Sequence, residues 1–125
     1  EGEEEEEGGE EEEGPEYDEH VWLSLRNAAV LTQYIADQLE AIDPDHEETY
    51  EANAAAYIDE LNELDSEYEA AVAEGATDTL LFGDRFPFRY MTEDYGLNYY
   101  AAFIGCSAET EASFETIMFR AGKVD

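Results

Sequence analysis

The stretch that decides the fold is PDHEETYEANAAAYIDELNELDSEYEAAVAEG, residues 44–75. Pro44 suits the first position of a helix, and Gly75 is a typical stop. About 30 helical residues would measure about 45 Å at 1.5 Å per residue. Three arrangements stay open for this helix: an antiparallel helix pair, a short coiled coil, or a rigid spine between two lobes. Apolar residues recur along it every three or four positions, which indicates one helix face: Tyr50, Ala54, Tyr57, Leu61, Leu64, Tyr68 and Ala71.

A second helix is predicted upstream, from Ser24 to Ile42. Ser24 is a plausible N-cap, and Asp43 can cap the helix that begins at Pro44. The apolar residues again fall at helical spacing and make one face: Ala28, Leu31, Ile35, Leu39 and Ile42.

The pattern changes after Gly75 to alternating strands and helices. Strand, helix, strand, helix is typical of a parallel α/β sheet. The predicted fold class is therefore α/β, in a chain that is rich in helix and has two or three short parallel strands. The predicted elements are a strand over 78–82, a helix with Phe88, Met91 and Tyr95 that stops at Gly96, a strand over 98–104, and a helix over 107–119.

Acidic residues dominate the charge, with 35 Asp and Glu against five Lys and Arg, a formal net charge of −30. Such a surface repels nucleic acid and anionic membranes and attracts cations. Residues 1–16 are almost entirely Glu and Gly, so we expect a disordered, solvated tail or a weak collector of cations. No apolar run approaches the ~18 residues of a membrane span. The chain opens with Glu and stops before a third strand, so we expect a piece of a longer protein.

The order of motifs resembles the zinc- and manganese-specific solute-binding proteins of metal-uptake ABC transporters. An acidic loop precedes a D-x-H-x-W motif, here Asp18-Glu19-His20-Val21-Trp22, and a helix, an Asp-Pro pair and a very long helix follow. The resemblance implies four segments: an acidic loop at 1–16, the end of an N-terminal lobe at 17–43, a long interlobe helix at 44–75, and the start of a C-terminal α/β lobe at 76–125.

The resemblance also implies that His20 is a metal ligand, because the histidine of this motif binds the ion in that family. A neutral imidazole is a good ligand for zinc or manganese. Asp18 and Glu19 either orient the imidazole by accepting from its other nitrogen or are solvated acids that continue the tail. Trp22 is predicted to pack in the core at the wall of a cleft, and His46 is predicted to be exposed.

The sequence departs from the family at a second ligand. That ligand, a histidine or glutamate, belongs to a stretch of the type S-H-D-A-F-x-Y, where this chain has GDRFPFRY. Aligning the aromatic residues places Arg85 at the ligand position, and a guanidinium has no lone pair to give. Arg85 and Arg89 are expected to pair with carboxylates. The other candidate ligands are Asp84, Glu109 and Glu111, and Cys106 if its thiol faced the metal.

The predicted function is extracytoplasmic binding of a divalent metal ion, zinc or alternatively manganese, for delivery to an ABC transporter permease. The protein would be periplasmic or lipid-anchored, and monomeric at full length. Binding is expected to weaken as the pH falls and His20 gains a proton. The alternative is a helical structural or interaction module with an acidic tail and no metal function. The stretch HVWLS from His20 to Ser24 matches no hydrolase pattern, and no glycine-rich phosphate loop links a strand to a helix, so an enzyme is not expected.

Overall fold

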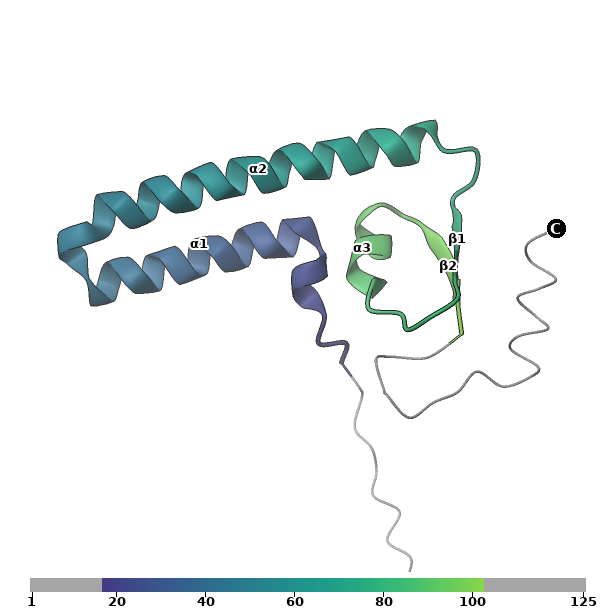
Figure 1. Ribbon diagram of the computed structural model, residues 1–125, viewed down its shortest axis with the longest axis horizontal. Helices are drawn as coiled ribbons and strands as arrows, with labels where there is room; N and C mark the ends of the chain where they lie inside the picture. Colours follow the sequence, from purple (N-terminus) through teal and green to yellow (C-terminus); the bar gives the residue numbers. More distant parts are fainter. Residues whose placement is uncertain (1–16, 103–125) are drawn as a thin grey trace, which may run out of the picture.

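Two long antiparallel helices dominate residues 17–102, the part of the chain described by this computed structural model (Figure 1). Helix α1 spans Leu25–Ile42 and helix α2 spans Glu47–Glu74. A short 3-10 helix precedes each of them, η1 (Val21–Leu23) and η2 (Pro44–His46). The antiparallel pair among the three predicted arrangements is thus confirmed. Helix α2 also continues past the start of α1 to a small β/α unit.

Local signals set the ends of the two helices largely as predicted. Ser24 caps α1, because its Oγ accepts a hydrogen bond from the backbone N of Asn27 at 3.1 Å. The predicted cap at Asp43 is wrong in detail, since its carboxylate makes no capping bond and instead accepts from the Tyr50 hydroxyl at 2.8 Å. The chain therefore makes the η2 turn from Pro44 before α2 begins.

The two helices bury two alanines and one leucine where they meet. Ala36 of α1 and Ala54 and Leu61 of α2 are buried, and small side chains let two helix backbones approach closely. Most of the apolar face predicted for α1 stays exposed within the described residues. Helix α2 buries the side of α1 that carries Ala36. The large apolar residues left exposed on α1 include Leu31, Ile35, Leu39 and Ile42.

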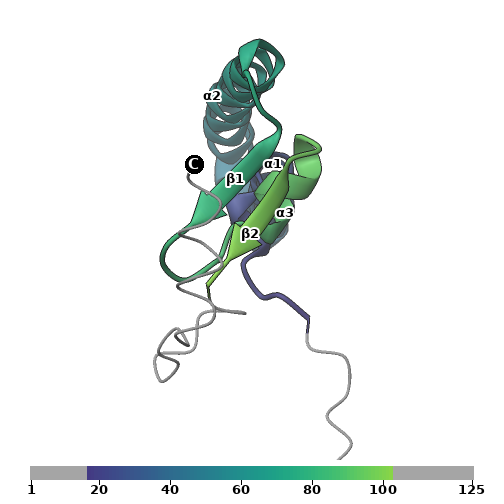
Figure 2. The same ribbon diagram turned by 90° about the vertical axis from the view of Figure 1, so that its right-hand side faces the viewer.

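The β/α unit follows α2 and contains two parallel strands. Strand β1 (Thr79–Phe82) pairs with β2 (Asn98–Ala101), and Thr79 lies opposite Asn98 (Figure 2). Helix α3 (Arg89–Asp94) connects them and is followed by Gly96, whose φ of +64° suits a residue without a Cβ. The α/β fold class is therefore confirmed for the described residues, whereas the helix expected over 107–119 lies outside them.

Phe86 forms the core of the β/α unit. Its side chain is 6% exposed, and its ring stacks on Tyr99 of β2 with centroids 4.0 Å apart. The ring of Phe82 on β1 meets it edge-on at 4.8 Å. One aromatic side chain of the loop that leads into α3 thus contacts both strands.

Glu40, near the end of α1, is held in an unfavourable environment. Its Oε1 is buried and has no hydrogen-bond partner among residues 17–102. Burial, followed by repulsion from Asp37, Glu47 and Glu51, raises the pKa of Glu40. The folded chain therefore holds this proton to a higher pH than the unfolded chain does. Stability falls as the pH rises through the folded pKa, because the ionised form is the disfavoured one.

Replacing Glu40 with glutamine is expected to stabilise the helix pair at pH 7 and to flatten the pH dependence of stability between pH 4 and pH 7. Urea unfolding at several pH values measures both effects. Glu60→Gln, at an exposed position of α2, is the matched control because it removes the same charge without the burial. Equal pH dependence in the two variants would contradict the assignment to Glu40.

No helix among the described residues combines the length and the apolar character needed to cross a bilayer. The acidic loop predicted for residues 1–16 lies outside the described residues, as do Cys106, Glu109 and Glu111. The four segment boundaries drawn from the resemblance, including a second lobe beyond α2, stay predictions.

Candidate metal centre

His20 lies at the junction between an extended segment and η1. It precedes η1, and its carbonyl accepts the backbone N–H of Leu23 at 3.1 Å. The side chain of His20 is only 12% exposed. One turn of 3-10 helix immediately before α1 therefore holds this imidazole in a fixed and mostly buried place.

Asp18 fixes the direction of the imidazole. Its Oδ1 accepts from the backbone N of His20 at 2.9 Å and contacts the ring Nδ1 at 2.8 Å. Burial alone would raise the pKa of Asp18, but the two bonds from His20 and the charge of Arg89 outweigh it and lower that pKa. An ionised carboxylate only accepts hydrogen bonds, so Nδ1 carries the ring proton. The lone pair of the neutral ring then lies on Nε2, which is the atom able to bind a metal ion.

Glu19 supplies the third candidate ligand. Its Oε1 lies 4.0 Å from Nε2 of His20, and its carboxylate is mostly exposed. Potential ligand atoms of Asp18, Glu19 and His20 all lie within 4.8 Å of one another, and residues 17–102 contain no other such group of three. Two roles were predicted for Asp18 and Glu19. Asp18 has the contacts of a residue that orients the imidazole, and Glu19 is a solvated acid near Nε2.

Trp22 lies beside His20 but is not a core residue. The ring centroids are 5.5 Å apart and tilted by 54°, and Trp22 is 54% exposed. The predicted core packing is therefore wrong within the described residues, because no other described element covers the indole. The two rings are nevertheless neighbours, because η1 turns the chain between them.

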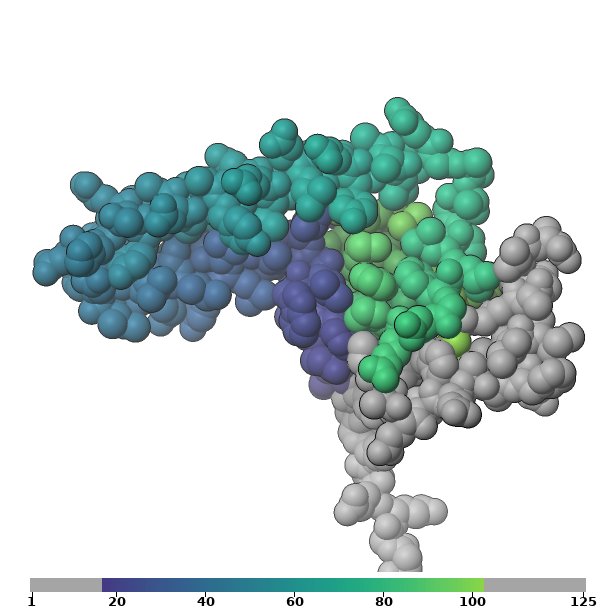
Figure 3. Space-filling model, viewed as in Figure 1, coloured from purple at the N-terminus to yellow at the C-terminus, as the bar shows by residue number. Residues whose placement is uncertain are grey.

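Helix α3 contacts the segment that carries His20. The hydroxyl of Tyr90 donates to the backbone O of Asp18 at 2.8 Å, and the hydroxyl of Ser24 donates to Oδ2 of Asp94 at 2.5 Å. In the space-filling view the purple segment before α1 lies against the green β/α unit (Figure 3). No sequence motif indicated these two bonds, and only the i, i+4 spacing of Tyr90 and Asp94 could have suggested a shared face.

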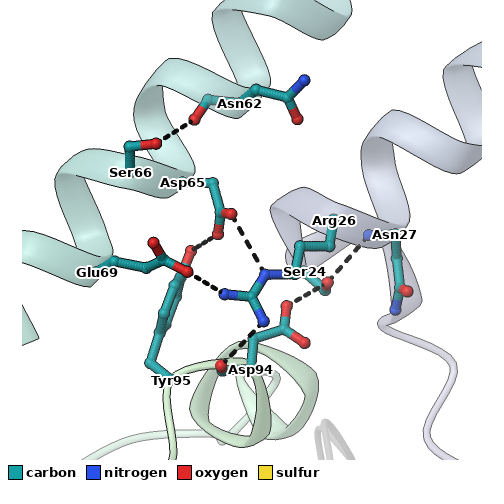
Figure 4. Close-up of polar contacts among 9 residues, drawn as sticks. All are labelled: Ser24, Arg26, Asn27, Asn62, Asp65, Ser66, Glu69, Asp94 and Tyr95. Carbon is teal, nitrogen blue, oxygen red and sulfur yellow. Dashed lines mark hydrogen bonds and ion pairs between the residues drawn. The ribbon is translucent and has the colours of Figure 1, made fainter.

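Arg26, two residues after the N-cap Ser24, joins α1, α2 and α3 (Figure 4). Its guanidinium contacts Asp65 at 3.3 Å and Glu69 at 2.7 Å on α2, and it donates to the backbone O of Asp94 at 3.2 Å. The hydroxyl of Tyr95 donates to Asp65 at 2.7 Å. Burial and then the bond to Asp65 raise the pKa of Tyr95, so the phenol keeps its proton.

Asp84, the other candidate ligand among residues 17–102, does not belong to the group of ligand atoms at His20. Asp84 is exposed, and its Oδ1 accepts from the backbone N of Arg85 at 2.8 Å. Asp84 stays a prediction, as do Glu109 and Glu111. Arg85 forms no ion pair with any residue in 17–102, whereas Arg89 lies 3.5 Å from Glu93, a pair that is solvent-exposed and weak.

His46 is exposed as expected. Its side chain is 66% exposed, and its Nδ1 contacts Oδ2 of Asp43 at 2.8 Å. The chain thus has two histidines with the same kind of aspartate partner and very different burial.

Comparison with known proteins identifies one matching family, described as the periplasmic zinc-uptake complex component A (ZnuA), over residues 1–124. The zinc-binding lipoprotein AdcA of Streptococcus pneumoniae is 41% identical over 98 residues, which cover 78% of this chain and 19% of AdcA. The iron ABC transporter substrate-binding lipoprotein MtsA of Streptococcus pyogenes is 39% identical over 83 residues, or 64% of this chain and 26% of MtsA.

A solved structure resembles most of the chain. A Zn(II)-bound mutant variant of AdcAII from Streptococcus pneumoniae superimposes with a TM-score of 0.74 at 31% identity, covering 93% of this chain and 42% of that one. The chain therefore spans about a fifth of AdcA and less than half of the structure that it resembles.

Proposed function

Because this chain belongs to the family of the periplasmic zinc-uptake complex component A, we propose that it is part of an extracytoplasmic protein that binds a divalent metal ion. The resemblance drawn from the D-x-H-x-W motif and the long helix is thereby confirmed. The ion would be cargo, delivered to the membrane permease of an ABC transporter.

The observation that carries this proposal is the state of His20. The imidazole is mostly buried, its Nδ1 is occupied by Asp18, and its Nε2 has no hydrogen bond to any described residue. A carboxylate on the far ring nitrogen is the usual support of a metal-binding histidine, because it fixes the tautomer and makes the ring a stronger donor. His20 thus has the geometry of a ligand that is ready to bind.

Zinc is the metal that we propose. Imidazole nitrogen suits zinc, whereas a set richer in carboxylates would favour manganese. The names of AdcA and of the AdcAII structure state zinc, which supports this choice. The name of MtsA states iron, so other divalent ions are the alternatives to be tested alongside zinc.

The family description also supports the finer features of the proposal. A component of an uptake complex binds and hands over its cargo, which agrees with transport and not with catalysis. The words periplasmic and lipoprotein in the descriptions of the family and of AdcA support a place outside the cytoplasm, free or lipid-anchored. We propose a monomer that docks on the permease. The structural or interaction module without metal function is the reading that the family match disfavours.

Titration of the isotope-labelled chain with zinc tests the proposal directly. Ring nitrogen shifts of His20 and His46 are followed separately by NMR. We expect Nε2 of His20 to move at the lowest zinc concentrations, with His46 unchanged until zinc is in large excess. The proposal fails if both histidines respond together, or if His20 does not respond at all.

A further inference from the structure

Two hydrogen bonds from α3 bracket His20 in the chain. Tyr90 binds the backbone O of Asp18, two residues before His20, and Asp94 binds the hydroxyl of Ser24, four residues after it. Tyr90 and Asp94 are four residues apart in a helix, so they lie on the same face. Helix α3 therefore holds both ends of the seven-residue segment 18–24, which carries the imidazole between them.

The first of these bonds reaches the ring through Asp18. The carbonyl of Asp18 is fixed by Tyr90, and its carboxylate Oδ1 accepts from both the backbone N and the ring Nδ1 of His20. A displacement of the Asp18 backbone would move the atom that sets the ring proton and the ring direction. The hydroxyl of Tyr90 thus acts on the imidazole without touching it.

The second bond fixes the other end. Ser24 is fully buried, and its hydroxyl donates to Asp94 while accepting from the backbone N of Asn27. The same side chain therefore starts α1 and ties that start to α3. Because η1 lies directly between His20 and Ser24, little freedom is left for His20 to move relative to α1.

Helix α3 is itself held by the long helices. Arg26 of α1 donates to the backbone O of Asp94, and Tyr95, directly after α3, donates to Asp65 of α2 and stacks on Tyr68 with centroids 5.6 Å apart. These contacts involve Asp94 and Tyr95 at the C-terminal end of α3, whereas Tyr90 lies near its N-terminal end. One end of α3 is therefore held by α1 and α2, and one face of α3 is bonded to the segment that carries His20.

We propose that α3 positions the imidazole of His20 and that Tyr90 and Asp94 are its positioning residues. The inference rests on the proposed function only in that His20 binds the metal ion. Binding sites need their ligands held within about 0.5 Å by surrounding bonds. In this chain a helix more than 60 residues downstream of His20 supplies those bonds.

The first test replaces Tyr90 with phenylalanine in the full chain, which removes one hydroxyl and keeps the ring. Ring nitrogen shifts of His20 without metal report the tautomer, and competition with a chelator reports zinc affinity. We expect the single Nδ1–H tautomer to become a mixture and the zinc dissociation constant to rise about 10-fold. Tyr57→Phe is the matched control, because the hydroxyl of Tyr57 makes no hydrogen bond with residues 17–102 and Tyr57 lies on α2.

The second test separates positioning from mere folding at Asp94. Asp94→Ala removes the acceptor of the Ser24 hydroxyl, whereas Asp94→Asn keeps a side-chain oxygen that can accept the same bond. We expect the alanine variant to lose the single tautomer and the asparagine variant to restore it. A role limited to folding would leave the tautomer of the folded fraction unchanged in both, and that result overturns the proposal.

The two claims fail in different ways. If His20→Ala leaves zinc affinity unchanged, the proposed function is wrong, yet the ring nitrogen shifts without metal still decide whether α3 positions the imidazole. If Tyr90→Phe and Asp94→Ala both keep the wild-type tautomer, positioning by α3 is wrong even where zinc binds at His20. Should one variant fail to fold, the other decides.

Discussion

Replacing His20 by alanine is expected to lower the zinc affinity of the chain at least about 100-fold, because residues that only support a ligand already contribute about 10-fold to 100-fold. The imidazole offers its Nε2 lone pair from a fixed and mostly buried position. Without it, Asp18 and Glu19 are left as two carboxylates on a short loop, which would hold zinc weakly. Calorimetric titration of both proteins with zinc measures the loss.

His46→Ala is the matched control for this experiment. His46 also contacts an aspartate through Nδ1 at 2.8 Å, but its side chain is 66% exposed and it belongs to no group of three candidate ligands within 17–102. Both variants lose one imidazole, and both keep the glutamates of residues 1–16 as weak background sites. Equal losses in the two variants, or no loss in either, would contradict a metal role for His20.

Phe86→Ala is expected to destabilise the β/α unit by about 3–5 kcal/mol, the usual range for truncating a buried phenylalanine. The ring contacts Phe82 of β1 and Tyr99 of β2, so its removal leaves a cavity where the two strands meet the loop before α3. A loss of this size is comparable to the whole stability of many small domains. Amide hydrogen exchange should show β1 and β2 losing protection while the middle of α2 keeps most of its own.

Leu81→Ala separates core packing from strand propensity. Leu81 lies on the same strand as Phe82 but is exposed, so its truncation leaves no cavity. We expect a change below about 1 kcal/mol, as is typical of exposed positions. If Leu81→Ala costs as much as Phe86→Ala, the aromatic cluster is not the core of the unit. If α2 loses protection together with the strands, the two parts unfold as one.

Local signals in the sequence predicted α1, α2, α3, β1 and β2, but not the 3-10 turns η1 and η2. The hydroxyl of Ser24, the helical spacing of apolar residues up to Ile42 and the glycine at 96 each act over fewer than five residues, so they can be found without a structure. The exposed part of the α1 face was not predictable in the same way, because spacing defines a face and not the element that covers it.

The candidate site was predictable only in part. The D-x-H-x-W motif selected His20, and the two-residue spacing allowed Asp18 to reach its ring. The bonds from Tyr90 and Asp94 join residues 72 and 70 positions apart. Pairings at that range depend on how α3 is placed against α1, which no local pattern encodes.

The joint among Arg26, Asp65 and Tyr95 contains a phenol that resists alkaline conditions. Burial and then the bond to Asp65 raise the pKa of Tyr95, and the bond to Asp65 also raises the pKa of Arg26, so both side chains keep their protons. A free tyrosine loses its proton near about pH 10. Base that ionises exposed tyrosines would therefore leave α1, α2 and α3 joined at this point.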